Sequence, residues 1–573
     1  MTNAGSAISF AADMAEPLSE PPLPRTGAGG LSRLLLAACA LLLFFGGLGA
    51  FPLLEPDEGR YAEIPREMLA LQDFVTPRLN GVLYFEKPPL YYWLNAAALS
   101  VLERPEVACR LASAFFGLAG VGLAWALGRS IGGRRTALRS AVILGTSPLW
   151  LALSRADIID MTLSFFLSAT LVCFWLAQER EKGEPGERLA WYGMFLAAAL
   201  ATLTKGLIGF VIPGAVIFFY LLFARRWRLL LRVPWIGGVA LFLLVAAPWH
   251  VLAARRNPDF LWFYFVHEHF LRYATPEANR RAPFWYFAAI LALGLLPWSG
   301  LLPAAGRLFR CGAGRLRDRP GLIFLACWAG FVFLFFSASQ SKLVPYILPA
   351  FPPLAVLIAL GLEEKEGRSL ALRIGGSVGA LVLTVLAAAF VWASLGNVER
   401  FSSVFTPTLF VFALPALAAG LLATALWARQ GVRRLWLLAA VPALIFGCLW
   451  ALGPRVSRRL SNQEIAHVLS SRLRPGDEVY SYRCYPQTVP VYTRRLIGAV
   501  AFVGELEFGI DRLSPEERAR RFPNAEQFRP LWSSGQTVYL VLEKRDLPRM
   551  QGDGLAPGPI LMEREKFLLM TNR

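Results

Sequence analysis

Long apolar stretches, separated by short charged ones, run through most of this chain. A hydrocarbon layer of about 30 Å requires roughly 20 mainly apolar residues for each helical crossing. Stretches of that length recur from residue 32 to residue 453, which predicts about 13 transmembrane helices. The expected crossings are a run that ends near Leu54 and the runs 106–128, 136–153, 158–177, 189–204, 206–224, 233–253, 284–305, 320–338, 344–361, 370–395, 404–427 and 433–453.

The first charged interval, Glu55–Tyr92, carries helix and turn signals of its own. Glu58, Ala62 and Pro65 recur at helical spacing, which predicts a short amphipathic helix on the membrane surface. Pro88-Pro89 is expected to end the connecting segment and to start a second helix. The sequence therefore predicts interfacial helices in this loop.

The apolar pattern stops at about Pro454, and shorter alternating segments follow it. Their periods predict a small α/β domain outside the membrane. It contains no GxGxxG motif and no Walker loop, so nothing in it indicates a nucleotide-binding enzyme. The expected elements are helices at 462–473, 515–522 and 525–532 and strands at 478–482, 538–543 and 566–570.

Charge predicts the orientation. The arginines form clusters at 129–139, 225–232, 307–319 and 429–434, each after an even-numbered crossing. Because short cytoplasmic loops are enriched in Lys and Arg, the amino terminus and these clusters are predicted to lie inside. The predicted organisation is a disordered cytoplasmic head at 1–31, a transmembrane domain at 32–453 with an outer loop at 55–92, and a periplasmic α/β domain at 454–573.

Composition agrees with a multi-pass membrane protein. Hydrophobic residues make up 55% of the chain and charged residues only 17%, with a mean hydropathy of +0.47. The net charge of +18 comes from arginines between apolar runs and not from a soluble basic face, so nucleic acid is not an expected partner. The seven cysteines contain no CxxC pair, which argues against a disulfide framework or a zinc knuckle.

With this orientation, the remaining polar stretches all fall on the outer side. Charges beside hydrocarbon are costly, and their convergence on one face is typical of a site, although outer loops also carry charge for solubility alone. The outer stretches are 55–92, 154–160, 204–206, 255–283 and 339–342.

Motifs in these stretches resemble a known family. Asp57-Glu58 is followed by Arg-Tyr-Ala-Glu and then by Phe-Glu-Lys-Pro-Pro-Leu at 85–90; Arg-Ala-Asp-Ile-Ile-Asp ends at Asp160, and Thr-Lys-Gly stands at 204–206. Together they resemble the bacterial aminoarabinose transferases, which are GT-C glycosyltransferases related to the protein O-mannosyltransferases. The resemblance covers the membrane part fully and the C-terminal domain only in kind. It implies a GT-C type helical fold with a C-terminal periplasmic α/β domain.

The resemblance also implies an activity. A sugar is transferred from a polyprenyl phosphate carrier to a membrane acceptor at the periplasmic face of the bacterial inner membrane. In the best-known members the sugar is 4-amino-4-deoxy-L-arabinose, the carrier is undecaprenyl phosphate and the acceptor is a phosphate of lipid A. The implied reaction-centre residues are Asp57, Asp160 and Glu58, and the implied carrier-phosphate ligands are Lys87, Arg60, Lys205, Arg272 and Tyr84.

The chemistry suits these residue types. A departing polyprenyl phosphate gains negative charge, which Lys and Arg stabilise well near a low-dielectric interface. Phosphate is already a competent leaving group, so no general acid is required, and a single displacement inverts the anomeric centre. An anionic acceptor leaves Asp57 free to orient the acceptor or the sugar amine, or to stabilise an oxocarbenium-like centre. A hydroxyl acceptor requires a base, and Asp57 is then the candidate. The structural alternative for Asp57 is a helix N-cap.

Further candidates are less specific. Lys342 and Tyr346 are four apart, as on one helical face, and are expected to line the carrier groove or to contact its phosphate. For them, and for Lys205, an interfacial snorkelling or aromatic-belt role is the alternative. Glu86 with His267 is a possible site for a divalent metal such as zinc, although the reaction itself requires no cofactor.

Two other functions remain open at this point. A protein O-mannosyltransferase-like enzyme would keep the carrier and fold but use a different acceptor. A lipid or sugar transporter would carry polar residues at the centre of the membrane or paired broken helices. Here the ionisable residues gather at one interface, which favours an enzyme.

Overall fold

The structure is a computed structural model. It describes residues 28–271, 282–310, 316–363, 373–385, 414–430, 435–457 and 460–573. Most of the predicted head, residues 1–27, lies outside these ranges, and so does part of the predicted crossings 370–395 and 404–427. The chain divides into two compact units, residues 1–42 and residues 43–573.

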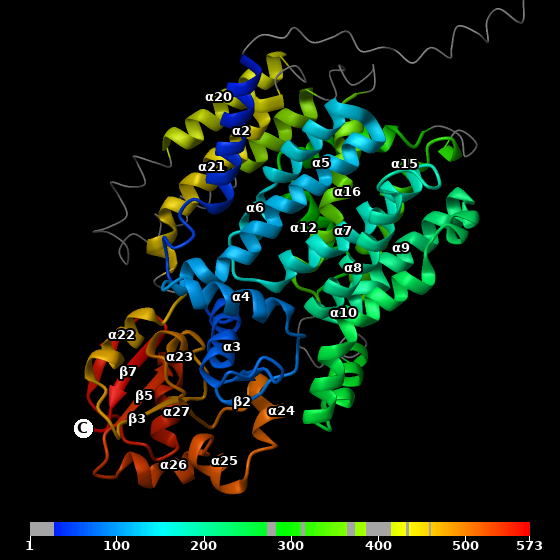
Figure 1. Ribbon diagram of the computed structural model, residues 1–573. Coiled ribbons are helices and arrows are strands. Elements are labelled where there is room, and N and C mark those ends of the chain that lie inside the picture. The colour runs from blue at the N-terminus through cyan, green and yellow to red at the C-terminus, as the bar shows by residue number, and fades with distance from the viewer. Residues whose placement is uncertain are drawn as a thin grey trace, which may run out of the picture. The chain divides into compact units, whose positions relative to one another are not determined.

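Helices dominate the apolar part of the chain (Figure 1). By length and composition, the described residues contain five helical stretches able to cross a membrane, or six if one bent pair is a single span. A multi-pass membrane protein is therefore confirmed. The helices are α2 (Ala28–Phe45), α5 (Pro105–Gly145), α6 (Pro148–Leu153), α7 (Ile159–Glu179), α8 (Glu187–Lys205), α9 (Ile208–Ala224), η1 (Trp227–Leu231), α10 (Trp235–Arg256), η2 (Trp262–Leu271), α12 (Tyr286–Gly294), η4 (Trp298–Leu301), α13 (Leu302–Arg307), α15 (Pro320–Ala338), η5 (Val344–Ala350), α16 (Phe351–Gly361), α20 (Leu414–Gln430) and α21 (Leu435–Ser457).

Gly133 divides α5 into two helices. It has φ 79° and ψ −169°, in the positive-φ region that glycine adopts without a steric cost. The division falls inside the first arginine cluster, where the sequence predicts a loop between the crossings 106–128 and 136–153. The two predicted helices are thus present, although no coil separates them.

The predicted crossing 284–305 is not a single straight helix. Tyr286–Gly294 and Trp298–Arg307 meet at an angle of 102°. Pro297 stands at the bend and has no N–H to donate to a preceding carbonyl, so a regular helix cannot continue through it. The apolar run predicted the length of this segment but not its break.

The expected helical face shared by Lys342 and Tyr346 is also absent. A 3-10 helix begins only at Val344, and Lys342 stands before it in extended chain, where its Nζ donates to the carbonyl of Ser339 at 2.6 Å. Pro345 and Pro349 both lack an N–H, which explains the irregular start of this span. The two side chains therefore do not share a helical face.

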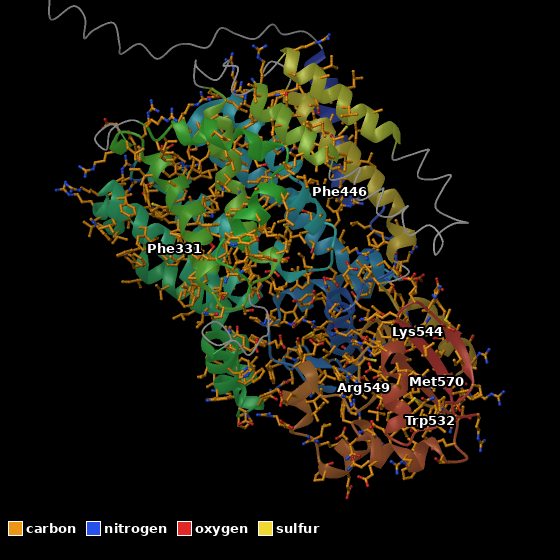
Figure 2. The ribbon with its side chains drawn as sticks, turned by 180° about the vertical axis from the view of Figure 1, so that it is seen from behind. Phe331, Phe446, Trp532, Lys544, Arg549 and Met570 are labelled. Carbon is orange, nitrogen blue, oxygen red and sulfur yellow. The ribbon has the colours of Figure 1, made fainter. Side chains whose placement is uncertain are left out.

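Aromatic side chains fill the centre of the helical part. Trp175 of α7 stacks on Phe324 of α15 with ring centroids 5.1 Å apart, and Tyr220 of α9 packs edge-on against Phe324 at 5.4 Å. Phe331, marked in Figure 2, lies seven residues after Phe324 in α15 and packs against Phe219 of α9 with ring centroids 5.8 Å apart. These contacts hold α7, α9 and α15 together and make α7 a central helix.

The C-terminal domain contains a five-stranded sheet of order β4-β3-β5-β7-β6. β3 pairs in parallel with β4 and β5, whereas β7 pairs antiparallel with β5 and β6. The predicted strands and helices are confirmed, and the sequence missed the short strands β4 and β6. The elements are α22 (Gln463–Arg472), β3 (Glu478–Tyr482), α23 (Thr488–Thr493), β4 (Gly498–Val500), η9 (Gly504–Leu506), α24 (Glu507–Ile510), α25 (Pro515–Arg521), α26 (Ala525–Trp532), β5 (Val538–Glu543), η10 (Lys544–Asp546), α27 (Leu547–Gly552), β6 (Ile560–Glu563) and β7 (Phe567–Thr571).

The two faces of this sheet bury different partners. On one face Tyr482, Leu540 and Met570 pack with Phe528 and Trp532 of α26; Trp532 and Met570 are marked in Figure 2. Alternate residues of the strands point to the other face. There they pack with α22 and, unexpectedly, with the first outer loop.

The first outer loop consists of α3 (Asp57–Leu71), a hairpin of β1 (Arg78–Leu79) and β2 (Val82–Leu83), and α4 (Leu90–Val101). α4 follows directly after Pro89, as the sequence predicts. Ile64 and Met68 of α3 share a buried apolar cluster with Val479 and Val541 of the sheet. Figure 1 shows α3 and β2 beside α23 and α24. The loop and the C-terminal domain therefore share one core.

Candidate active site

Glu55 fastens the start of the outer loop to the C-terminal domain. Its carboxylate accepts hydrogen bonds from Asn462 Nδ2 at 3.1 Å, Gln487 N at 3.0 Å and Thr488 N at 2.8 Å. Burial raises its pKa, although these donors oppose the shift. A buried carboxylate needs several donors, and the C-terminal domain supplies them.

Gly59 permits the close approach of α3 to α23. A Cβ atom at this position would lie 2.8 Å from Thr488 N and 2.9 Å from the Gln487 carbonyl carbon. On the other side of the loop, Asn80 Nδ2 donates to the Ile497 carbonyl at 2.8 Å and Asn80 Oδ1 accepts from Ile497 N at 3.0 Å. The loop is thus held at both ends.

Glu58 lies in a buried ion pair. Its carboxylate binds the Arg110 guanidinium through two bonds of 2.8 and 2.6 Å, and it also accepts from Leu54 N at 2.8 Å and Asp157 N at 2.9 Å. The Glu58 side chain is 5% exposed and that of Arg110 is 0% exposed. These contacts join α3, α5 and the turn before α7, and they occupy both oxygens of Glu58.

Asp57 occupies the first turn of α3 and points the other way. Its side chain is 60% exposed, makes no N-cap hydrogen bond, and lies 3.2 Å from Arg60 Nη2. Arg60 Nε lies 2.8 Å from Glu505 Oε2, and Tyr84 donates its hydroxyl to the same oxygen at 3.4 Å. Arg60 therefore links the exposed aspartate to a carboxylate of the C-terminal domain.

Asp160, in the first turn of α7, has its own cation. Lys205 Nζ, in the last turn of α8, donates to Asp160 Oδ1. The same ammonium lies 4.5 Å from the centre of the Tyr346 ring. Asp160, Lys205 and Tyr346, from three separate helical elements, thus form one contact chain.

Tyr61 of α3 is buried, and its pKa responds to both aspartates. Burial raises the pKa of Tyr61, Arg60 opposes the shift, and Tyr92, Asp57 and Asp160 add to it, so all four groups act on one hydroxyl. The Tyr61 ring lies 6.3 Å from that of Tyr92. Helix α3 thus supplies one aspartate–cation pair, and α7 and α8 together supply a second.

Lys87 is the cation of a third group of charged side chains, and its partners are acidic. Its Nζ lies 3.3 Å from Glu268 Oε2 and 3.7 Å from Glu86 Oε2, and donates to the Glu86 carbonyl at 2.7 Å. Phe85, just before it, packs edge-on against Phe260 with ring centroids 5.1 Å apart. The motif at 85–90 thus brings η2 against the outer loop.

Glu86 and His267 are the expected metal ligands, and no third ligand accompanies them among the described residues. The ring of His267 stacks on Phe263 at 5.0 Å, and its Nδ1 lies 3.4 Å from Glu268 Oε1. In the part of the chain that the structure describes, no group of three His, Cys, Asp or Glu residues is arranged to hold a metal. The Arg272 prediction lies outside the described residues.

The sequence did not identify Glu505, Arg110, Tyr61 or Tyr92 as site residues. Glu505 is 445 residues from Arg60 along the chain, and nothing in its local sequence sets it apart from the other acids of the C-terminal domain. Arg110 follows Cys109 near the start of an apolar run, and an arginine buried at that depth is itself a signal of a partner.

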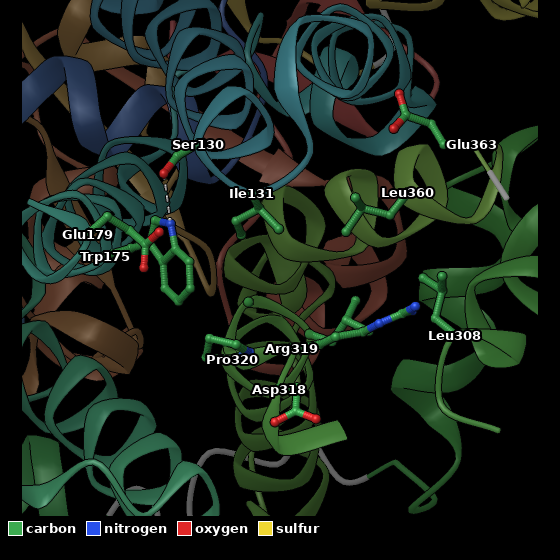
Figure 3. A pocket seen from close by; sticks show the side chains of 12 residues that line it. Ser130, Ile131, Trp175, Glu179, Leu308, Asp318, Arg319, Pro320, Leu360 and Glu363 are labelled. Carbon is green, nitrogen blue, oxygen red and sulfur yellow. Dashed lines mark hydrogen bonds between the residues drawn. The ribbon is translucent and has the colours of Figure 1, made fainter. Parts of the chain in front are cut away.

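A separate cavity of about 520 Å³ lies at the opposite ends of these helices (Figure 3). Trp175 lines it and donates its indole N–H to Ser130 Oγ at 3.1 Å, and Glu179, Asp318 and Glu363 surround it. None of the predicted site residues lines this cavity.

Comparisons with known proteins show the family and the fold. Residues 31–265 match the family described as dolichyl-phosphate-mannose-protein mannosyltransferase, and residues 465–571 match the aminoarabinose transferase C-terminal domain. The structure of ArnT from Cupriavidus metallidurans bound to undecaprenyl phosphate superimposes with a TM-score of 0.81 at 30% identity, covering 95% of this chain and 98% of that one. The archaeal oligosaccharyltransferase AglB from Archaeoglobus fulgidus, 13% identical with a TM-score of 0.50, shares the fold alone.

Curated relatives are similar over much of the chain. The undecaprenyl phosphate-alpha-4-amino-4-deoxy-L-arabinose arabinosyl transferase of Aeromonas salmonicida is 34% identical over 441 residues, 74% of this chain and 77% of the relative. The protein of the same name from Pseudomonas aeruginosa LESB58 is 32% identical over 555 residues, 90% of this chain and 96% of the relative.

The chain combines a helical membrane part, loops that carry paired acids and cations, and a C-terminal α/β domain. It is a glycosyltransferase of the GT-C class. Within that class, the chain belongs to the family of undecaprenyl phosphate-alpha-4-amino-4-deoxy-L-arabinose arabinosyl transferases.

Proposed function

We propose that this protein transfers 4-amino-4-deoxy-L-arabinose from undecaprenyl phosphate to a phosphate of lipid A, with inversion at the anomeric carbon. The observation that supports this most directly is that Asp57 and Asp160 each pair with a cation, Arg60 and Lys205 respectively. The relatives' names give the carrier and the sugar. The lipid A acceptor rests on the resemblance to the best-known aminoarabinose transferases.

In this proposal the cations and the acids have separate tasks. Lys87, Arg60 and Lys205 bind the carrier phosphate and stabilise the charge that it gains as the glycosyl bond breaks. Tyr84 and Tyr346 contact the same region through Glu505 and Lys205 respectively. Asp57, the more exposed aspartate, orients the acceptor or stabilises positive charge on the sugar, and Asp160 positions Lys205.

We assign Glu58 a structural part in this scheme, because its oxygens are occupied by Arg110 and backbone donors. Lys342, which is buried and donates to a backbone carbonyl, contributes to the shape of the groove and not to the phosphate. Arg272 remains a proposed phosphate ligand from the resemblance alone.

We propose a bacterial inner-membrane location with about 13 crossings, the N-terminus in the cytoplasm, and both the active site and C-terminal domain in the periplasm. The arginine clusters on the opposite loops support this orientation. Cysteine labelling from each side of the membrane at Glu507→Cys and Arg228→Cys, in a chain without its native cysteines, tests it. Reaction of the second residue from the periplasmic side would reverse the orientation.

The proposed reaction requires no metal, because phosphate leaves without acid assistance and a phosphate acceptor is already anionic. If Glu86 and His267 hold a divalent ion such as zinc, its effect is on the shape of the loop. Chelation that leaves transfer unchanged supports this proposal. Chelation that abolishes transfer, with recovery on adding zinc, would make the ion essential.

Mass spectrometry of lipid A from cells with and without the chain tests the activity. We expect phosphate-linked aminoarabinose only with the active chain, and we expect Asp57→Ala and Lys87→Ala to abolish it at unchanged protein levels. Asp259→Ala, a 63% exposed aspartate on the same outer face, is the matched control. An unchanged lipid A profile would reject this acceptor. It would favour the protein O-mannosyltransferase-like alternative, which the match of residues 31–265 keeps in view.

A further inference from the structure

Asp157 is a buried carboxylate to which the reaction described above gives no part. It lies in the turn between α6 and α7, three residues before Asp160, and none of its surface is exposed. Tyr91 donates its hydroxyl to Asp157 Oδ1 at 2.6 Å, and Asn95 Nδ2 donates to the same oxygen at 2.9 Å. Both donors belong to α4, so one carboxylate oxygen ties the turn before α7 to that helix.

The same group of residues also binds α3. Asn95 Nδ2 donates to the carbonyl of Tyr61 at 3.1 Å, and the backbone N–H of Asp157 donates to Glu58 Oε1 at 2.9 Å. Glu58 and Tyr61 both belong to the part of α3 that begins with Asp57. The turn before α7 and the start of α3 are therefore bound to each other as well as to α4.

Ser113 of α5 completes this network. Its hydroxyl oxygen lies 3.1 Å from the Tyr91 hydroxyl and 3.1 Å from the Ile158 carbonyl oxygen, and it can donate to either. Tyr91, Asn95, Ser113 and Asp157 are all 0% exposed. Buried polar groups that bind one another resist displacement, because movement leaves a donor or an acceptor without a partner. The network thus fixes the start of α7 relative to α3.

The two segments that the network joins carry the two aspartate–cation pairs. Asp57 of α3 lies 3.2 Å from Arg60, and Lys205 donates to Asp160 in the first turn of α7. In the proposed function Asp57 acts at the sugar or the acceptor and Lys205 binds the carrier phosphate, so the separation of the pairs must match the donor between them. A misplacement of about 1 Å can lower a rate by about 100-fold.

We propose that Asp157 is a positioning residue for the transfer reaction, which sets the separation of the two aspartate–cation pairs without touching the substrate. This inference rests on the proposed function, because it presupposes that both pairs act in transfer. Oδ1 of Asp157 accepts both side-chain bonds, whereas Oδ2 has no hydrogen-bond partner among the described residues. The network therefore requires one acceptor oxygen at this position and not a second.

Two substitutions of Asp157 test this requirement. Asp157→Asn keeps an acceptor oxygen for both donors, and we expect it to retain kcat within about threefold. Asp157→Leu has no acceptor, and we expect kcat to fall by about 10- to 100-fold, with a smaller change in the KM for the donor, because every group that binds the donor is still present. A loss in Asp157→Asn as large as that in Asp157→Leu would overturn the proposal.

Tyr91→Phe keeps the proposal testable if Asp157→Leu does not fold. It removes one of the two donors, and we expect kcat to fall by about 3- to 10-fold. Tyr220→Phe is the matched control, because Tyr220 is also 0% exposed and donates its hydroxyl to Gln178 Oε1 at 2.8 Å, at the opposite end of α7 from Asp160. The two substitutions should lower Tm by similar amounts, but Tyr220→Phe should leave kcat unchanged. Equal kcat values for these two variants would overturn the proposal.

A double variant tests whether the network acts through the paired residues. Once Asp160→Asn has disrupted its pair, adding Tyr91→Phe should cause little further loss of kcat. A purely structural role of the network would lower kcat by the same factor with and without Asp160→Asn, and that result would overturn the proposal. Absence of transfer by the wild type from undecaprenyl phosphate-linked aminoarabinose to lipid A would instead reject the proposed function, and this inference with it.

Discussion

Arg60 of the first outer loop and Glu505 of the C-terminal domain form an ion pair, with Nε and Oε2 2.8 Å apart. Both side chains are largely shielded from water, and the same guanidinium contacts Asp57. A residue of the small domain is therefore joined through Arg60 to Asp57 of the first outer loop. This contact and the core shared with α3 attach the C-terminal domain to the first outer loop.

Gly59 is expected to be essential for the docking of α3 on α23. In Gly59→Ala, the new methyl group meets the backbone at Thr488 and Gln487, neither of which can move without disturbing the Glu55 bonds. We expect a loss of about 1–3 kcal/mol of stability, measured as a lower Tm in detergent. Gly122→Ala, also within a helix but with open space around its Cβ, is the control and should be neutral or slightly stabilising.

Glu58 and Arg110 are expected to matter for folding more than for chemistry. Removal of one partner leaves a buried charge without its counter-ion, which costs about 3–5 kcal/mol. We therefore expect both Arg110→Met and Glu58→Gln to reduce the yield and Tm sharply, because Glu58→Gln leaves the Arg110 charge buried and turns an NH2 group toward N–H donors. Folded Glu58→Gln protein that keeps its Tm but loses kcat would return Glu58 to the catalytic set.

Glu67 is expected to make stability fall with rising pH. It is buried beside Glu63 and accepts from Gly81 N, with Arg66 and Tyr485 also near; burial and the neighbouring Glu63 raise its pKa to about 8. The native state holds this proton more tightly than the unfolded chain, so the resulting stability is complete below pH 4.5 and is lost as the pH rises through 8.

Glu67→Gln replaces the carboxyl group with an amide of similar shape that stays uncharged at every pH. Its Tm is expected to match that of the wild type near pH 5 and to exceed it near pH 9, by on the order of 5 °C. Thermal unfolding in one detergent across this range measures the difference. Parallel curves for the two proteins would show that Glu67 is already ionised in the native state.

Asp160 and Lys205 are expected to act as one unit. Because Lys205 donates to Asp160 and faces Tyr346, either Asp160→Asn or Lys205→Gln should lower kcat by at least about 100-fold. The kcat of the double variant should be no lower than that of the less active single variant. Transfer by purified protein gives these rates. Multiplying losses in the double variant would show that the two residues act independently.

The sequence by itself predicted a multi-pass helical membrane protein and an orientation for it. Runs of apolar residues predict the helices because unpaired backbone groups are too costly in hydrocarbon. The arginine clusters predict the orientation because short cytoplasmic loops are enriched in Lys and Arg. The strands of the C-terminal domain follow from period-two patterns, so β3, β5 and β7 were found within a residue. The family motifs added Asp57, Lys87, Asp160 and Lys205 as candidates.

Tertiary structure decided which of these groups meet. The pairing of Lys205 with Asp160 and of Arg60 with Glu505 joins residues far apart in the chain, and no local period records such a contact. The break at Pro297 and the late helix start at Val344 arise because proline has no backbone N–H to donate. The pattern of apolar residues does not show this. Glu58 shows the same division most clearly. It is adjacent to Asp57 in the sequence, but Glu58 is buried against Arg110, whereas Asp57 pairs with Arg60 and stays 60% exposed.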